Sequence, residues 1–183
     1  MCAHPGPTPS GAGSFPALMR APRRLDPDRA VEHLPRLYRA ARAWTRSREE
    51  AEDLVQETYA RVLSRPRLIR NEDEIGYLIR ALRNTLISRR RAEQRRPVTT
   101  ELDEESPFAT RASDDPAEAV ETRRVYAAIA QLPDEFREVL IAVDVAGLSY
   151  PEAAEALGVP EGTITSRLFR ARDRVARMLS ESE

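Results

Sequence analysis

The sequence stands out first for what it lacks. Its 183 residues include no lysine, one cysteine, seven glycines and only 5% aromatic residues. The lone Cys2 excludes a disulfide framework and a cysteine-based zinc site, so we expect no metal and no cofactor. No apolar run approaches the ~18 residues that a membrane-spanning helix needs. The N-terminus also lacks the basic-then-apolar order of a signal peptide. We therefore expect a soluble, cytoplasmic protein.

All 29 basic residues are arginine, and 30 acidic residues bring the formal net charge to −1. Arginine binds phosphate and guanine through two parallel hydrogen bonds, but codon usage in a GC-rich genome also explains the absence of lysine. The distribution says more than the total. Between Gly76 and Arg96 lie seven arginines and one acid, Glu93. This block predicts salt-dependent attraction to phosphate, with a solvated charged helix end as the alternative.

The frequent helix formers (Ala, Leu, Arg and Glu) and apolar residues at three- and four-residue steps predict an all-α fold. We expect two small helical domains, an N-terminal bundle and a C-terminal helix-turn-helix domain, joined by a flexible acidic linker. Periodicity is absent at the N-terminus and again in an acidic stretch with Pro107 and Pro116. The predicted ranges are 1–26 for a disordered tail, 27–97 for the first domain, 98–117 for the linker and 118–183 for the second domain.

Three helices are predicted in the first domain. The first carries the apolar residues from Val31 to Trp44 on one face. The second begins at the capping box Ser47–Glu50 and ends before Pro66. The third carries an apolar face from Ile75 to Ile87, and Pro97 closes the segment.

A helix-turn-helix is predicted over Ser149–Arg172. Ser149 and Glu152 form a second capping box, and Gly158 lies where a tight turn needs a positive φ. The next helix has two faces. One face is apolar and the other polar, and a polar face of short hydroxyls followed by arginine suits entry into the major groove of DNA. A capped hairpin with a merely solvated polar face is the alternative. The apolar face holds Ile164, Leu168, Ala171 and Val175, and the polar face holds Thr163, Ser166, Arg167 and Arg170.

The segment Gly162–Arg172 resembles the helix with which bacterial sigma factors read the -35 promoter element, most closely in the extracytoplasmic-function group. The stretch Ala51–Thr58 independently resembles the most recognisable part of that group's first domain. The resemblance covers about residues 30–97 and 118–180, in the family's order. It implies a sigma region 2-like domain that binds core polymerase and the -10 element, and a region 4-like domain that binds the -35 element.

The resemblance implies three sets of site residues. The -35 set is Gly162, Thr163, Ser166, Arg167 and Arg170; the -10 set is Tyr77, Arg80, Arg83 and Asn84; the polymerase-binding set is Asp53, Leu54, Gln56 and Glu57. The loop 67–73 corresponds to a family pocket for a flipped -10 base. Tyr77 stands where the family often has Trp, and it could instead be a core residue. Ser88 and Thr165 also depart from the family pattern, at positions that are often Asp and often basic.

We therefore expect a transcription initiation factor and not an enzyme. The resemblance implies core RNA polymerase (β′ clamp helices and β flap), promoter DNA and an anti-sigma factor as partners. Two alternatives remain on sequence alone. A stand-alone helix-turn-helix regulator would need a dimer and a palindromic site, and a protein-binding helical adaptor would not need DNA at all.

Overall fold

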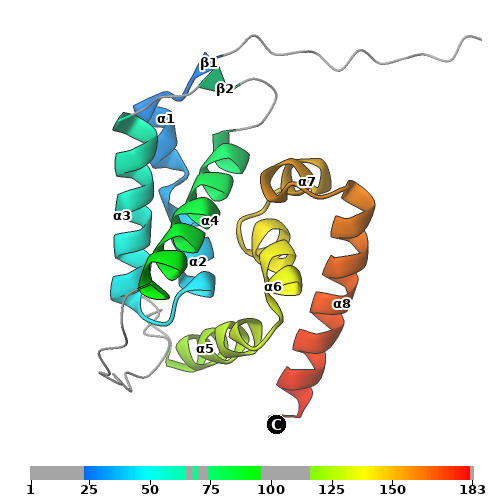
Figure 1. The fold of residues 1–183 in the computed structure, drawn as a ribbon. Helices are drawn as coiled ribbons and strands as arrows, with labels where there is room; N and C mark the ends of the chain where they lie inside the picture. Colours follow the sequence, from blue (N-terminus) through cyan, green and yellow to red (C-terminus); the bar gives the residue numbers. More distant parts are fainter. Residues whose placement is uncertain (1–22, 65–67, 70–73, 96–115, 182–183) are drawn as a thin grey trace, which may run out of the picture.

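The computed structural model describes residues 23–64, 68–69, 74–95 and 116–181, and these form helices apart from one short two-stranded ladder (Figure 1). The all-α prediction is confirmed. The first half contains β1 (Arg23–Arg24), α1 (Pro27–Glu32), α2 (Leu34–Trp44), α3 (Arg48–Ser64), β2 (Leu68–Ile69) and α4 (Glu74–Glu93). The second half contains α5 (Pro116–Ala130), α6 (Asp134–Leu140), the π-helix η1 (Ile141–Val145), α7 (Tyr150–Leu157) and α8 (Glu161–Ser180).

The first predicted helix is in fact two, because the chain breaks at His33 between α1 and α2. Pro35 is in the first turn of α2, where its missing N–H costs nothing, whereas a continuous helix would set its ring against the preceding turn. Because of this break, α1 and α2 do not share the single apolar face that the sequence predicted. Val31 is consequently 62% exposed, while Leu37 and Trp44 remain in the core.

Helix α3 begins at the predicted cap. The Glu50 N–H donates to Ser47 Oγ at 3.1 Å, and the Glu50 carboxylate accepts from the Arg46 N–H at 2.8 Å. The Glu50 side chain therefore accepts from the N–H of Arg46, whereas a standard capping box would use the N–H of Ser47. Behind the cap, Leu54 and Val55 are buried against α2 and α4, the two helices that α3 contacts most.

The fold includes part of the segment that the sequence assigned to the tail. Strand β1 pairs antiparallel with β2, with Arg23 opposite Ile69 and Arg24 opposite Leu68. Leu25, which follows β1, is buried in the core. The ladder therefore ties the start of the described chain to the segment that precedes α4.

The helix-turn-helix forms as predicted. Ser149 and Glu152 make the full capping box of α7. Gly158 adopts φ +70° at the C-cap of α7, in the left-handed region that a side chain would strain. Gly147, which follows the helix before α7, also has a positive φ of +73°. The sequence did not predict the π-helix η1, which carries Asp144 toward α8.

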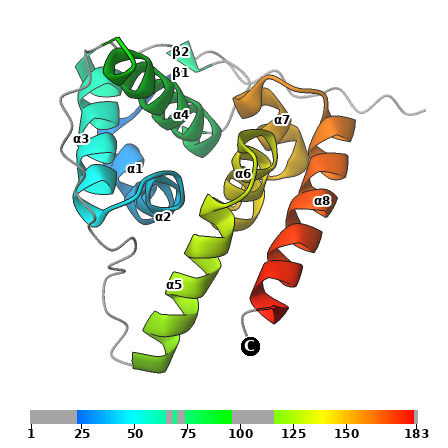
Figure 2. The same cartoon turned by 60° about the horizontal axis from the view of Figure 1, so that its bottom comes forward.

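The two halves of the chain pack against each other. Helix α2 contacts η1 and α5, and α4 contacts α7, so the buried apolar side chains form one continuous cluster across both halves. Figures 1 and 2 both show α7 next to α4, with α8 on the far side of α6 and α7. The sequence predicted a tether between the domains but gave no sign of this contact, which we call the interdomain seam.

Candidate nucleic-acid interface

Helix α8 is the candidate recognition helix, and its two faces separate as predicted. Ile164, Leu168 and Ala171 are fully buried against α6 and α7. On the far side, Gly162, Ser166 and Arg170 are exposed, whereas Thr163 and Arg167 lie at the margin and are half-buried. The exposed strip therefore centres on Ser166, at the middle of the surface that α8 can present to a groove.

Two hydroxyl groups near the start of α8, those of Thr165 and Ser166, donate their protons to the helix backbone. Ser166 Oγ donates to the Thr163 carbonyl at 3.2 Å, and Thr165 Oγ1 donates to the Glu161 carbonyl at 3.3 Å. Because each hydroxyl has a single proton, both oxygens face outward as acceptors. In this geometry they match the amino groups of adenine or cytosine, and a phosphate contact would require the hydroxyl to turn.

The two predicted arginine readers of α8 differ in their surroundings. Arg167 Nη2 lies 3.1 Å from the carboxylate of Glu135 on α6. Within the described part of the chain, Arg170 has no ion-pair partner and is exposed. Arg170 can therefore approach a guanine without breaking an intramolecular contact, whereas Arg167 must first leave Glu135.

Sequence reasoning missed Phe169, the most exposed large apolar side chain among the described residues, at 75%. It lies on the exposed side of α8, with Ser166 between it and Arg170 around the helix. A signal was present in the sequence, because Phe169 is out of phase with the buried stripe of Ile164, Leu168 and Ala171. An aromatic ring at this place can contact thymine methyl groups, which are the apolar feature of the major groove.

The -10 set divides into buried and exposed members. Tyr77 is only 8% exposed, which agrees with the alternative that it belongs to the core, and the Arg80 guanidinium lies 5.7 Å from its ring centroid. Asn84 is exposed on α4. Arg83 contacts Glu138 of α6 across the seam. The expected base pocket at 67–73 falls, apart from β2, outside the described residues.

The polymerase-binding set lies on α3, and its members are not equally accessible. Asp53 and Gln56 are exposed, but Leu54 is fully buried and can only support the surface from beneath. Glu57 is half-buried and forms ion pairs with Arg61 and with Arg89 of α4. The freely presented part of this surface is therefore Asp53 and Gln56.

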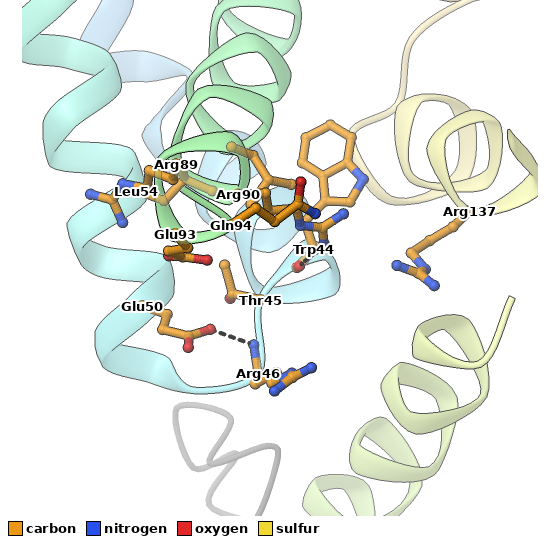
Figure 3. A pocket seen from close by; sticks show the side chains of 11 residues that line it. Trp44, Thr45, Arg46, Glu50, Leu54, Arg89, Arg90, Glu93, Gln94 and Arg137 are labelled. Carbon is orange, nitrogen blue, oxygen red and sulfur yellow. Dashed lines mark hydrogen bonds between the residues drawn. The ribbon is translucent and has the colours of Figure 1, made fainter. Parts of the chain in front are cut away.

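A cavity of about 450 Å³ opens where the seam meets the ends of α2 and α4 (Figure 3). Trp44 and Leu86 contribute apolar walls, and the remaining lining is mostly charged, with arginine predominating. Arg137 belongs to the second half of the chain, and burial lowers the pKa of its guanidinium. The charged lining residues are Arg46, Glu50, Arg89, Arg90, Glu93 and Arg137.

A further ion pair holds α8 against the π-helix. The guanidinium of Arg172 donates to both carboxylate oxygens of Asp144, at 2.9 and 2.6 Å, and this bonding raises the arginine pKa. The pair links η1 to α8, which is also packed against α5, α6 and α7. No cluster in the described part of the chain could hold a metal ion, and none of its helices is long and apolar enough to cross a membrane.

Comparison with known proteins finds a family match in each half of the chain. Residues 30–96 match the family described as Sigma-70 region 2, and residues 122–175 match Sigma-70, region 4. The ECF RNA polymerase sigma factor SigM of Mycobacterium tuberculosis is 35% identical over 80% of this chain and 73% of its own length. SigE of Mycolicibacterium smegmatis is 31% identical over 97% of this chain and 70% of its own length.

Two solved structures share the fold. One is the sigma factor RpoE in complex with the anti-sigma factor NepR from Bartonella quintana, with a TM-score of 0.63, 24% identity, and coverage of 84% of this chain and 95% of that one. The other is CnrH in complex with the cytosolic domain of CnrY, with a TM-score of 0.60, 22% identity, and coverage of 85% and 88%. At these identities the likeness concerns the fold alone.

Proposed function

The chain belongs to the extracytoplasmic-function (ECF) sigma factors, which direct RNA polymerase to promoters, and on that premise we propose how its residues divide the work. Helix α8 reads the -35 element as duplex DNA, and α4 captures the unpaired -10 strand. Binding energy drives strand separation, and the protein is a non-enzymatic factor that acts in the cytoplasm.

The observation that supports -35 reading best is the exposed strip of α8. It combines an arginine without an intramolecular partner (Arg170), an outward-facing acceptor (Ser166) and an exposed aromatic ring (Phe169). These three chemistries match guanine, an exocyclic amino group and a thymine methyl, respectively. We therefore add Phe169 to the -35 set and rank Arg170 above Arg167.

We propose that α3 docks on the β′ clamp helices of core polymerase through Asp53 and Gln56, and that the second domain contacts the β flap. Both α3 side chains are exposed and lie on one face, so they present an acidic and amide surface to a basic partner. We also propose an anti-sigma factor as a regulatory partner, since both fold relatives were solved with a bound partner and one of these is described as an anti-sigma factor.

Run-off transcription with core polymerase tests this assignment. The intact chain should start transcripts at a defined promoter class that core enzyme alone ignores. The double substitution Asp53→Arg with Gln56→Arg should abolish polymerase binding by charge repulsion while the melting temperature stays unchanged. Glu57 is left alone in this design because its pairs with Arg61 and Arg89 also support the fold.

The matched control is Glu32→Arg. Glu32 is exposed at the end of α1, so this change reverses the same charge in the same domain but on a different helix from the α3 surface. It should leave polymerase binding within about threefold of the unchanged protein. Normal polymerase binding by the Asp53→Arg, Gln56→Arg protein would show that α3 does not carry the docking surface.

A further inference from the structure

The arginine-rich cavity beside Trp44 has the size and the composition of a ligand site. Its volume of about 450 Å³ lies within the range of small-molecule pockets, which is about 300–1,000 Å³. Trp44 and Leu86 form an apolar wall. Figure 3 shows Arg137 extending from α6 toward the side on which Trp44 and Arg90 lie. An apolar wall that faces directed charged groups is an arrangement that binds a small polar ligand in one orientation.

The charge of Arg137 is only partly compensated within the protein. Its guanidinium donates to the Leu132 carbonyl, and its Nη1 lies 3.0 Å from the carboxylate of Asp134, a side chain that is 70% exposed. The Nε of Arg137 is buried and has no hydrogen-bond acceptor in the described part of the chain. A buried donor without an acceptor is costly, and such a group commonly marks the place of a bound ion or water.

A second arginine, Arg90 of α4, adds positive charge to the same cavity. It donates its Nη2 to the Trp44 carbonyl, at the C-terminal end of α2, at 3.3 Å. Among the described residues its one ion pair is with Asp134 again, at 4.0 Å from Nη1, so a single exposed acid serves two arginines. After burial, the charge of Arg90 is a further cause of the lowered pKa of Arg137, because two nearby cations repel each other. An anion bound between them would relieve this repulsion.

Arg46 completes the basic side of the cavity. Its side chain is exposed, and it forms no ion pair with any residue that the structure describes. The two acids of the lining do not neutralise these arginines, because the Glu50 carboxylate accepts from the Arg46 N–H at 2.8 Å as part of the α3 cap, and Glu93 is exposed at the end of α4. Arg89 also lines the cavity but is held by Glu57. Together with the two arginines above, Arg46 therefore leaves the cavity with an excess of positive charge.

We propose that this cavity is a binding site for a nucleotide that carries two adjacent phosphates. The phosphates bind the arginines, because a guanidinium group holds phosphate oxygens through paired, charge-assisted hydrogen bonds. The base lies against the apolar wall of Trp44 and Leu86, and the exposed carboxylate of Glu93 accepts from an amino group or a ribose hydroxyl. None of the residues named for this site belongs to the promoter-reading or polymerase-binding sets, so the site does not rest on the proposed function.

The chain contains a single tryptophan, so its fluorescence reports on this cavity directly. Titration of the intact chain with ADP or GDP should change the Trp44 emission until it saturates, and calorimetry should give the same dissociation constant. Inorganic pyrophosphate should bind about tenfold or more weakly than the nucleotides, because it lacks the base that contacts the indole. Adenosine, which lacks the phosphates, should show no binding over the same concentrations.

Substitutions of the three arginines test the phosphate contacts. Arg90→Gln and Arg137→Gln should each weaken ADP binding about tenfold or more. Both arginines also donate to a backbone carbonyl, so circular dichroism and the melting temperature without ligand report whether each variant folds. Arg46→Gln carries no such risk, because its side chain is exposed and forms no ion pair among the described residues. It should weaken ADP binding about fivefold or more through the loss of a charge-assisted hydrogen bond.

Arg123→Gln is the matched control. Arg123 is exposed on α5, has no ion-pair partner within the described ranges and does not line the cavity. The substitution removes the same charge as Arg46→Gln from the same kind of exposed position. It should leave ADP binding within about twofold of the unchanged protein, because salt screens charges that do not touch the ligand.

Three results would overturn the proposal. If neither ADP nor GDP binds the intact chain, or if Arg123→Gln weakens binding as much as Arg46→Gln does, the cavity is not the site. If pyrophosphate binds as tightly as ADP, the base does not contact Trp44 and the ligand is not a nucleotide. If a short single-stranded DNA without terminal phosphates displaces ADP while ADP itself binds more weakly, the arginines hold a nucleic-acid backbone instead.

Discussion

Arg167 on the recognition helix is paired with Glu135 of α6 at 3.1 Å, whereas Arg170, one turn further along, meets no carboxylate in the described chain. Both arginines belong to the polar side of α8, but only Arg167 is held by an ion pair within the described part of the protein. Both ends of the Arg167–Glu135 pair are substantially exposed, so the pair itself contributes at most about 1 kcal/mol. Its effect is to orient Arg167 away from the centre of the groove face.

Arg170→Ala should therefore cost more than Arg167→Ala. A bidentate contact to guanine accounts for about 1–3 kcal/mol of discrimination, so we expect a tenfold to hundredfold loss of promoter affinity and relaxed preference at one -35 base pair. Binding of the polymerase complex to duplexes varied at each -35 position measures both effects. Arg177→Ala, on the same helix but paired with Asp173, serves as the control. An equal or larger loss from Arg167→Ala would contradict the ranking.

Gly158→Ala should lower the stability of the protein, whereas Gly162→Ala should raise it. An added Cβ meets no atom within 4 Å at either position, so packing does not distinguish them. Gly158 has φ +70°, where a side chain costs about 1–2 kcal/mol, whereas Gly162 is within a helix, where alanine gains about 0.5–1 kcal/mol. In thermal unfolding the melting temperature should fall by roughly 2–4 °C per kcal/mol for Gly158→Ala. A rise for Gly158→Ala would show that the turn relaxes into another conformation.

Ser149→Ala should destabilise α7 by about 0.5–1 kcal/mol, at the lower end for a helix cap. The reason is geometric, because the Glu152 N–H reaches Ser149 Oγ only at 3.4 Å while the Ser149 N–H retains its 2.7 Å bond to the Glu152 carboxylate. Denaturant unfolding measures the change. Ser149→Asp should also destabilise the helix although aspartate is a good cap, because Ser149 Oγ donates to the Glu152 carboxylate at 2.7 Å and an aspartate would lose that bond and face a like charge. Ser180→Ala, at the far end of α8, should change stability by less than about 0.5 kcal/mol.

Tyr59 should make the protein sensitive to alkaline pH. Its hydroxyl donates to the Ala30 carbonyl at 2.6 Å and links α3 to α1, and burial raises its pKa to about 12. A raised folded pKa means that the stabilisation is fully present below pH 10, the unfolded value, and is lost as the pH rises toward 12.

Tyr59→Phe tests this dependence. It should cost about 1 kcal/mol at pH 8 through the lost hydrogen bond, and its free energy of unfolding should then decline less between pH 10 and pH 12 than that of the unchanged protein. Burial also raises the pKa of Tyr126, so part of the decline remains in the variant. Equal declines in the two proteins would remove Tyr59 as a cause.

Features set by neighbouring residues were predictable from the sequence. The capping box at Ser149, the left-handed Gly147 and Gly158, and the buried stripe of α8 all follow from local rules of backbone geometry and helical period. The break at His33 was also local, but the apolar spacing from Val31 to Leu37 outweighed the meaning of Pro35. The periodicity of apolar residues predicts which face of a helix is buried, but it does not predict whether the helix is continuous.

Features set by distant partners were not predictable. No local pattern indicates that Glu138 meets Arg83, that Arg36 reaches two carbonyls of η1, or that Glu57 is held by Arg89. These contacts depend on how two surfaces meet after the helices have formed. Most site assignments that the structure refines are of this kind. A residue type at the right spacing identifies a surface, but its neighbours in space decide which of its members are free.

The interdomain seam also bears on how the protein unfolds. Because the buried apolar cluster is continuous across both halves, we expect the two halves to lose their structure together. A single unfolding transition then reports on both domains at once, and a lowered melting temperature does not by itself reveal which domain a substitution has weakened.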